Sequence, residues 1–474
     1  MHDSGFPQCG RGLRGATEAV IAYVGGGSLN WAPTLMGDLA AHGGVSGEVR
    51  LFDIDRESAE RNAGLGNRYA KETGCRIRYA AEPDLTRALS GADVVVISIL
   101  PGSFEAMASD LSIPAAHGIA QSVGDTVGPG GFMRALRAIP MMAVIGRAIA
   151  AHAPRAFVCN LTNPMSVLTG TLHAVAPEVR SWGECHEVTK LRQIAARIGN
   201  QRRPGEGYTH RDVQTNVLGI NHFTFVDAIS LDGMDLMDDY LAFADAHSAD
   251  GWRETPSDPD NEWQSYFEDV NRVKFDLTSR YGIAAAAGDR HLAEFLPQSD
   301  YLAAAQNWGF GLTPVEFRMR DRDARAELLE GWSHGDGALP PVERSAEAFL
   351  DQIVALLTGE VHISNANLPN RGQVAGLPAG AVVETNAVFS GLGVQPIQAG
   401  RLPAGLEAIV ADHAERQSAL VRAVLAGDRD ALFPLFASDP ALWGLGEDQR
   451  YKMYTDMLAA TAAWLPETLT PEAA

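Results

Sequence analysis

Cys185-His186 and Asn221-His222 are the residues whose types and spacing first suggest chemistry. His222 follows Cys185 by 37 residues (222 − 185). A thiolate and an imidazole are suitable ligands for a borderline divalent ion, and two protein ligands leave open positions for water or substrate. The pair therefore allows a catalytic metal site, although spacing alone favours a buried cysteine and a hydrogen-bonded core histidine.

A glycine-rich turn is the second such feature. Gly25-Gly26-Gly27-Ser28 follows the apolar run Ala19–Val24, and glycines after a strand let the backbone approach a pyrophosphate at a helix N-terminus. The pattern departs from G-x-G-x-x-G, because Asn30 stands at the third glycine position. Asp53 and Asp55 end the next apolar run, where an acid can accept the ribose hydroxyls of NAD. Together these features predict a nicotinamide cofactor, and a tight turn without a ligand is the alternative.

Three further motifs carry polar residues that could face a ligand. Thr162-Asn163-Pro164 follows an apolar run, which puts Asn163 at the carboxyl end of a sheet, where open α/β folds bind ligands; a simple Asn-Pro turn is the alternative. Residues 121–133 (QSVGDTVGPGGFM) form either a loop around a ligand or an irregular crossover. Residues 288–294 (GDRHLAE) combine two acids with Arg290 and His291, a cluster that on a protein surface usually has no function.

The elements that must position these motifs alternate along the chain. Apolar runs predict strands at Ala19–Val24, Val49–Ile54, Val94–Leu100, Ala156–Leu161 and Asn216–Ile220, and helical spacing predicts helices at Trp31–Ala41, Arg56–Glu72, Met133–His152, Phe267–Arg280 and Leu406–Leu425. Strand, turn and helix in alternation indicate parallel βαβ units. We therefore predict an α/β fold with an N-terminal Rossmann-type doubly wound parallel sheet and an intertwined C-terminal α+β substrate domain. The predicted bounds are residues 1–17 for a flexible leader, 18–200 for the Rossmann domain and 201–474 for the second domain, which would also carry the oligomer contacts.

Composition excludes several classes of partner. The 474 residues include 38 Lys+Arg and 59 Asp+Glu, a net charge of −21, whereas nucleic acids and anionic membranes require a basic face. The apolar runs are strand-sized and too short to span a bilayer. Cys9, Cys75, Cys159 and Cys185 lie far apart without CxxC spacing, which argues against a disulfide scaffold and fits the cytoplasm.

Longer motifs resemble a known family. In order, GGGS, LFDID, the stretch ISILPGSFEAMASDLSIPAAHGIAQSVGDTVGPGGFMRALR, NLTNPMSV, GECHEV, LGINHFTF and GDRHLAEFLP are similar to the NAD- and manganese-dependent family-four glycoside hydrolases, an exception to two-carboxylate catalysis. Within them the chain is most similar to the α-galacturonidases and to the sister family of NAD-dependent sulfoquinovosidases. The resemblance implies a retaining α-glycosidase: hydride transfer from C3 acidifies the C2 hydrogen, a base removes it, the leaving group departs from C1, and water addition and reduction follow.

The resemblance also implies roles for individual residues. Cys185 and His222 match the metal ligands, and His186 matches the leaving-group acid, with a residue of the second metal shell as its alternative. Tyr281 matches the base that removes the C2 hydrogen. The implied cofactor-binding residues are Gly25, Gly26, Gly27, Ser28, Asp53, Asp55, Pro101 and Asn160, and the implied substrate-binding residues are Asn163, Asp125, Arg134, Lys190, Arg290 and His291.

Lys190 decides the expected substrate. It follows the Cys185-His186 motif, where α-galacturonidases have a short stretch of Gly, Thr or Gln. A planar carboxylate is best held by a bidentate arginine, whereas a rounder sulfonate also suits a lysine. We therefore expect an anionic α-glycoside, narrowly a sulfoquinovoside, with an α-galacturonide as the alternative and a plain NAD-dependent sugar dehydrogenase as a lesser one. The resemblance further implies a homodimer or homotetramer, and the net charge of −21 argues against nucleic-acid or membrane partners.

Overall fold

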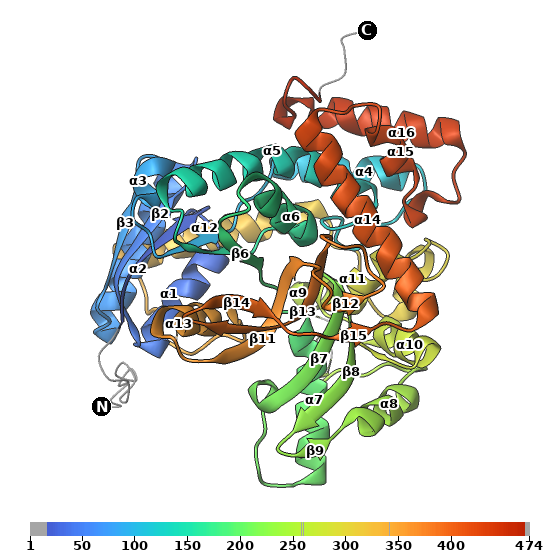
Figure 1. The fold of residues 1–474 in the computed structure, drawn as a ribbon, viewed down its shortest axis with the longest axis horizontal. Coiled ribbons are helices and arrows are strands. Elements are labelled where there is room, and N and C mark those ends of the chain that lie inside the picture. Colours follow the sequence, from blue (N-terminus) through green and yellow to red (C-terminus); the bar gives the residue numbers. More distant parts are fainter. Residues whose placement is uncertain (1–16, 257, 259, 341, 470–474) are drawn as a thin grey trace.

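The computed structural model describes residues 17–256, 258, 260–340 and 342–469 (Figure 1). The expected leader, residues 1–17, lies outside this range except for Thr17, which is already the first residue of β1. The strands are β1 (Thr17–Val24), β2 (Val45–Phe52), β3 (Ile77–Ala81), β4 (Val94–Ile97), β5 (Phe157–Asn160), β6 (Arg180–Gly183), β7 (Val213–Ile220), β8 (Phe223–Leu231), β9 (Met234–Asp235), β10 (Ala284–Ala285), β11 (His362–Pro369), β12 (Val374–Ala375), β13 (Val382–Ser390), β14 (Gly393–Pro396) and β15 (Gly400–Arg401).

The helices connect and cover these strands. They are α1 (Trp31–His42), α2 (Arg56–Thr73), α3 (Leu85–Leu89), α4 (Phe104–Ala116), α5 (Gly128–His152), α6 (Met165–Val175), α7 (Val188–Arg202), α8 (Met237–Ala246), α9 (Glu262–Phe267), α10 (Arg272–Tyr281), α11 (Asp289–Leu292), α12 (Val315–His334), α13 (Phe349–Thr358), α14 (Ala404–Ala426), α15 (Leu432–Ala437) and α16 (Glu447–Thr461).

The largest sheet has the strand order β14-β13-β11-β6-β5-β4-β1-β2-β3. Strands β1 to β6 are parallel and stand in the order 3-2-1-4-5-6, which is the dinucleotide-binding arrangement with its switch point between β1 and β4. The predicted Rossmann sheet is thus confirmed. Strands β11, β13 and β14 extend it in antiparallel pairing, so residues from the second half of the chain complete the sheet of the first.

Two apolar layers hold the helices against this sheet. Val95, Ile97 and Val158 face a layer with α5, α6 and the C-terminal helices α14, α15 and α16. Val94, Val96 and Cys159 point to the opposite side, toward α1, α2 and α13. The alternation along β4 and β5 buries both faces, as a doubly wound parallel sheet requires.

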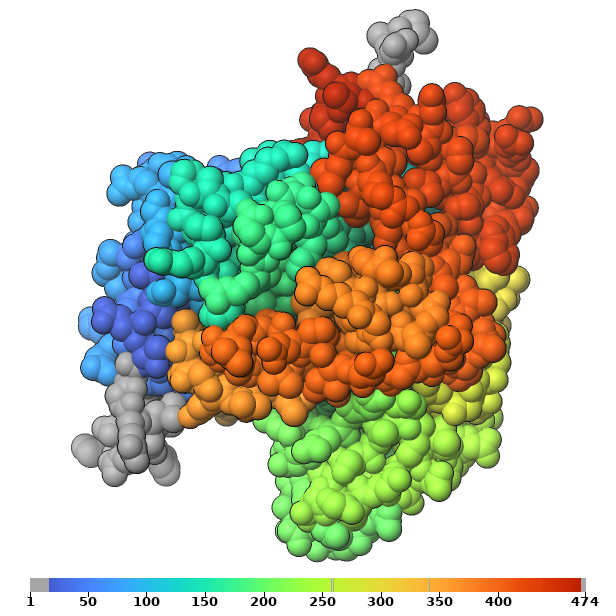
Figure 2. Space-filling view, viewed as in Figure 1, coloured from blue at the N-terminus to red at the C-terminus, as the bar shows by residue number. Residues whose placement is uncertain are grey.

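The two halves of the chain are interleaved. The second sheet, β10-β8-β7 with β9 on β8, lies beside the first, and the predicted boundary after residue 200 falls within the last turn of α7. Figure 2 shows the interleaving at the surface, where the orange segment lies between the blue N-terminal part and the green part.

The predicted helix at Phe267–Arg280 is wrong as a single element. Helix α9 ends at Phe267 and α10 begins at Arg272, because Asn271 has a φ of 60° and redirects the chain. Helix α5 is long and apolar enough to cross a membrane by length and composition alone, but 56% of its apolar window is buried inside the fold. It is the central helix of one apolar layer.

Candidate active site

The glycine turn has the geometry that a pyrophosphate needs. Gly25 has a φ of 93°, and a Cβ there would overlap the carbonyl oxygen of Ser98, so glycine alone fits. The Gly27 N–H donates to Oδ2 of Asp53 at 2.8 Å, and the Trp31 N–H donates to Oγ of Ser28 at 3.1 Å. The turn therefore leads directly into the N-terminus of α1, where N–H donors and the helix dipole favour an anion.

Two of the predicted cofactor residues have other roles. Both carboxylate oxygens of Asp55 accept from Ser58, so Asp55 caps α2. Asn160 is fully buried, and its side chain bonds to Thr162 and Thr169, so it shapes the loop after β5. Sequence reasoning missed Asn62, whose amide donates to the Gly26 and Ser28 carbonyls at 2.7 and 2.8 Å and holds the turn from α2.

Asp125, His222 and His291 form a group of described residues that could hold a metal ion. Each offers one ligand atom, and the three atoms lie within 4.8 Å of one another. The two imidazole rings stack with their centroids 3.7 Å apart, and Nδ1 of His291 is buried without a hydrogen-bond partner. One carboxylate oxygen and two imidazole nitrogens suit a borderline divalent ion, so the donor set fits the predicted metal.

The fold places these three ligands from distant segments. His222 occupies the tight turn between β7 and β8 with a φ of 65°, an uncommon conformation for a residue other than glycine that often marks a functional site. Its Nδ1 lies 2.9 Å from Oγ1 of Thr126, which also donates to Asp125 at 2.7 Å. Burial alone would raise the pKa of Asp125, but His291, Arg134 and His222 lower it, so the carboxylate is ionised.

Cys185 and His186 lie on the loop between β6 and α7. Cys185 is buried and does not belong to the three-residue group; burial, with Glu384 and Glu187 nearby, raises the pKa of its thiol. Its predicted role as a ligand stays a prediction. The His186 ring lies 5.8 Å from the Trp31 ring at the cofactor turn, and its Nδ1 is 3.3 Å from Oε1 of Glu347. Burial lowers the pKa of His186, but Glu347 and then Glu187 outweigh it and raise the pKa to about 9.

Asn163, Arg134 and Pro101 reach the same edge of the sheet. Asn163 Nδ2 donates to Asp125 at 3.2 Å, while its Oδ1 is buried without a partner. Arg134 Nε donates to the Asn163 carbonyl at 3.1 Å. Pro101 follows β4, the neighbour of β1 across the switch point. The predicted substrate residues Asp125, Asn163, Arg134 and His291 are thus brought together around one point.

Lys190 is not free to capture a substrate anion. Its Nζ lies 3.4 Å from Oδ2 of Asp269. Burial lowers the pKa of Lys190, but the charges of Asp269 and Glu187 outweigh burial and raise this pKa above its ordinary value. Glu187 in turn accepts from the Gly288 N–H at 2.7 Å. Lys190 therefore joins α7 to the 288–294 segment, and the argument for a sulfonate that rested on this lysine is wrong.

Within the described residues, no hydrogen bond, ion pair or ring contact joins Tyr281 to Asp125, His222 or His291. It is the last residue of α10 and lies against Gly405, 3.7 Å from the position of a Cβ there. The opposite end of α10 faces the site, where the Lys274 N–H donates to Asp289 at 2.9 Å. Nine rises of 1.5 Å separate the two ends of α10 by about 14 Å, so Tyr281 lies away from this contact, and its assignment as base stays a prediction.

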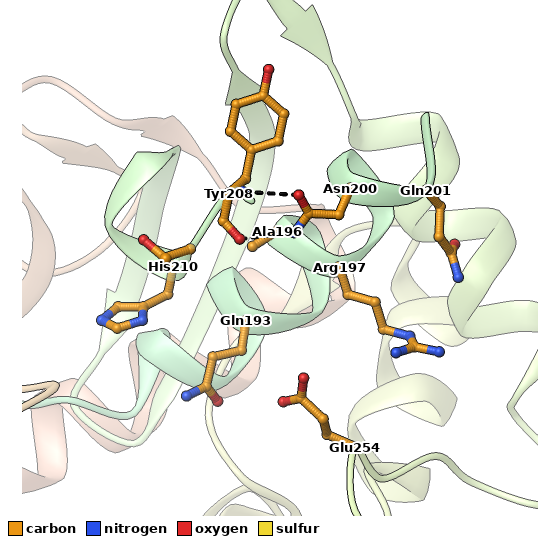
Figure 3. Close-up of a pocket in the computed structure, with 9 residues that line it drawn as sticks. Gln193, Ala196, Arg197, Asn200, Gln201, Tyr208, His210 and Glu254 are labelled. Atoms are coloured by element: carbon orange, nitrogen blue, oxygen red, sulfur yellow. Dashed lines mark hydrogen bonds between the residues drawn. The ribbon is translucent and has the colours of Figure 1, made fainter. Parts of the chain in front are cut away.

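A polar cavity of about 420 Å³ opens on α7 (Figure 3). It is lined by Gln193, Ala196, Arg197, Asn200, Gln201, Tyr208, Thr209, His210 and Glu254. Within it, the Tyr208 N–H donates to Oδ1 of Asn200 at 2.8 Å. It shares no residue with the metal group or the cofactor turn, so it is separate from the candidate active site.

Known proteins show the same organisation over most of the chain. Residues 20–201 match the model of family 4 glycosyl hydrolases, and residues 217–442 match that of the family 4 C-terminal domain. An α-galacturonidase of Thermoanaerobacterium saccharolyticum is 41% identical over 94% of this chain and 97% of its own length. An α-galacturonidase of Bacillus subtilis is 43% identical over 92% of this chain and 96% of its own length.

Solved structures of related proteins have the same fold as this chain. The crystal structure of lplD from Bacillus subtilis superposes with a TM-score of 0.87 at 41% identity, covering 93% of this chain and 99% of that one. A 6-phospho-α-glucosidase from gut microorganisms, solved in complex with NAD and Mn²⁺, has the same fold, with a TM-score of 0.78 at 16% identity over 95% and 99% of the two chains. Because both family models match and relatives are 41–43% identical over more than nine-tenths of the chain, this chain belongs to family 4 of the glycosyl hydrolases.

Proposed function

We propose that the protein is an α-galacturonidase that requires NAD and a divalent metal ion, preferably Mn²⁺. The main support is that Asp125, His222 and His291 each offer a ligand atom, and that these atoms lie within 4.8 Å of one another. The chain is also 40–43% identical to four α-galacturonidases. The NAD and Mn²⁺ in a solved relative of the same fold support both cofactors. When bound, NAD accepts and returns a hydride, and the metal ion polarises the sugar's oxygens.

The residues around this point have separate tasks in the proposed reaction. Asn163 and Arg134 position the sugar beside the metal group, since Asn163 Oδ1 has no hydrogen-bond partner among the described residues. His186, held on Nδ1 by Glu347, carries the proton for the leaving oxygen and lies next to the cofactor turn. The cofactor's pyrophosphate binds at Gly25 to Gly27, and Asp53 holds this turn through the Gly27 N–H.

The choice between carboxylate and sulfonate follows from the available cations. Lys190, the reason to expect a sulfonate, is neutralised by Asp269. The remaining cations near Asp125 are arginines, which suit a planar carboxylate. We also propose a cytoplasmic location, supported by the free thiols of Cys159 and Cys185. The dimer or tetramer stays a prediction.

The test is turnover of nitrophenyl α-galacturonide beside nitrophenyl α-sulfoquinovoside, with and without NAD and Mn²⁺. We expect faster release of nitrophenol from the galacturonide, dependence on both additives, and no net change in NADH absorbance. Faster turnover of the sulfoquinovoside would overturn the proposed substrate. Stoichiometric accumulation of NADH would identify a sugar dehydrogenase instead.

A further inference from the structure

Arg318, at the start of α12, carries a half-buried guanidinium that forms no ion pair within the described residues. Among the described residues its side chain makes no hydrogen bond or ion pair, and its Nε is buried without a partner. A buried polar group is normally hydrogen-bonded, and a buried charge is normally paired. The Arg318 guanidinium is therefore available to pair with an anion.

Arg290 is the second cation near Phe267, and only part of its guanidinium is hydrogen-bonded. Its Nη2 donates to the Ser122 carbonyl at 2.8 Å and also contacts Oγ1 of Thr313, which fixes the guanidinium in one orientation. Its Nε, however, is also buried without a partner. The loop carbonyl thus positions Arg290 and leaves donor capacity on the other edge of its planar group.

Both guanidiniums pack on one aromatic ring. Arg290 lies 5.1 Å and Arg318 lies 5.5 Å from the centroid of the Phe267 ring. The ring holds the two cations near each other, and burial followed by the charge of Arg290 lowers the pKa of Arg318. Two like charges held together in a desolvated place favour an anionic ligand between or beside them.

No described carboxylate neutralises the pair directly. Glu294 is the nearest candidate on the same segment, but its Oε1 accepts the Val123 and Gly124 N–H groups at 2.7 and 2.8 Å and so holds the loop that carries Asp125. Neither arginine forms an ion pair within the described residues, whereas Lys190 does. The arginine pair therefore carries positive charge near the active site that no carboxylate of the described residues pairs with directly.

The pair adjoins the metal group. Arg290 directly precedes His291, and the charge of Asp125 acts on both arginines. Arg134 donates to the Asn163 carbonyl, and burial, with a smaller contribution from the charge of Arg318, lowers the pKa of Arg134. An anion bound by Arg318 and Arg290 would therefore lie near the residues that we propose contact the sugar.

We propose that Arg318 and Arg290, set on Phe267, bind the C6 carboxylate of the substrate and that Arg318 determines specificity for a uronide over a neutral hexoside. This inference rests on the proposed function and adds the residue that selects its substrate. A guanidinium offers two parallel N–H groups to a planar carboxylate, which a lysine cannot do. Removal of Arg318 therefore weakens binding of the acid but not of its uncharged counterpart.

The experiment compares nitrophenyl α-galacturonide with its methyl ester, and titrates free galacturonate and galactose by calorimetry in the presence of NAD and Mn²⁺. For Arg318→Ala we expect kcat/KM on the acid to fall at least about thirtyfold, as for loss of a buried charged partner, and kcat/KM on the ester to be unchanged. Galacturonate affinity falls by the same factor. Arg318→Lys keeps the charge and loses the bidentate grip, so it shows a smaller loss on the acid.

Arg320→Ala is the matched control. Arg320 lies on the same helix, but it is exposed and pairs with Glu262, so its removal leaves both substrates and galacturonate binding unchanged. If Arg318→Ala does not fold, as a melting curve would reveal, the acid-to-ester ratio of Arg318→Lys decides. Equal losses on acid and ester, or an unchanged galacturonate affinity, would overturn the inference.

The calorimetric titration separates this inference from the proposed function. If the wild type fails to hydrolyse the galacturonide but binds galacturonate in a way that needs Arg318, the proposed function fails and the carboxylate site stands. If the wild type hydrolyses it and neither binding nor the acid-to-ester ratio depends on Arg318, the carboxylate site fails and the proposed function stands.

Discussion

Asp125→Asn tests whether the three-residue group holds the metal ion. The change preserves shape and removes the one negative charge that Asp125 contributes beside His222 and His291. The present partners donate to different oxygens of the carboxylate, Thr126 to Oδ1 at 2.7 Å and Asn163 to Oδ2 at 3.2 Å, and the new amide has one oxygen that keeps one of these hydrogen bonds. The perturbation therefore removes one negative charge and one hydrogen bond.

The expected size follows from the loss of one charge-assisted bond in a buried site, about 1.5–3 kcal/mol. This corresponds to a Mn²⁺ dissociation constant that is about 10- to 150-fold larger. Turnover should fall at low Mn²⁺ and recover in part as Mn²⁺ is raised. Calorimetric titration of Mn²⁺ into metal-free protein measures the affinity, and a melting curve checks the fold.

Asp227→Asn is the control for net charge. Asp227 is an exposed acid on β8, the strand that follows His222, and it accepts from Asn216 at 2.7 Å. Its removal should leave Mn²⁺ affinity unchanged. If Asp125→Asn binds Mn²⁺ as tightly as the wild type while Cys185→Ser does not, the ion is held by Cys185 and His222, and the reasoning from the three-residue group is refuted.

Three further predictions concern the cofactor turn and stability. Gly25→Ala forces a Cβ into a backbone with φ of 93° and should cost about 1–3 kcal/mol of stability and most NAD affinity; an unchanged NAD titration would contradict it. Arg137 Nη1 donates to Asp110 at 3.0 Å, and both side chains are buried. Asp110→Ala leaves Arg137 as an unpaired buried charge, so urea unfolding should show that the free energy of unfolding falls by about 3–5 kcal/mol. A fall of less than about 1 kcal/mol, as for an exposed ion pair, would contradict this prediction. Burial, then Arg416, lowers the pKa of His413 from 6.5 to about 4, so the unfolded state binds more protons between these values and the free energy of unfolding falls as pH drops from 6.5 toward 4. His413→Gln should reduce that slope in urea titrations at several pH values, and equal slopes would exclude this histidine as the cause.

The Rossmann half could be predicted because its signals are local. Apolar runs such as Ala19–Val24 and Val94–Ile97 are short and bounded by polar or glycine residues, and helical spacing between them leaves few possible topologies. The glycine turn follows for the same reason, since a positive φ at Gly25 is recorded in the residue type itself. The resemblance to family 4 motifs added the predictions that the protein binds NAD and a divalent metal ion.

Side-chain partners could not be predicted in this way. Lys190 looked available in the sequence, and only Asp269, 79 residues later, neutralises it. Asp55 looked like a ribose ligand, and its own helix uses it as a cap. Tyr281 matched a motif, and the structure places it at the C-terminal end of α10. Lys190 is paired with a residue that is distant in the sequence, whereas Asp55 bonds to Ser58 within its own helix, so the residue type alone did not show which partner takes its hydrogen-bond capacity.

The sequence by itself determined the Rossmann-type fold class, the parallel strands that are strongly apolar and the glycine turn after the first of them, because these depend on periodicity and backbone conformation within a few residues. Only the tertiary structure decided that Asp125, His222 and His291 meet, that strands β11, β13 and β14 complete the N-terminal sheet, and that Arg318 and Arg290 share one ring. These contacts join residues tens to hundreds of positions apart. Their energies arise from burial and charge in the assembled core, which exist only after the chain has packed.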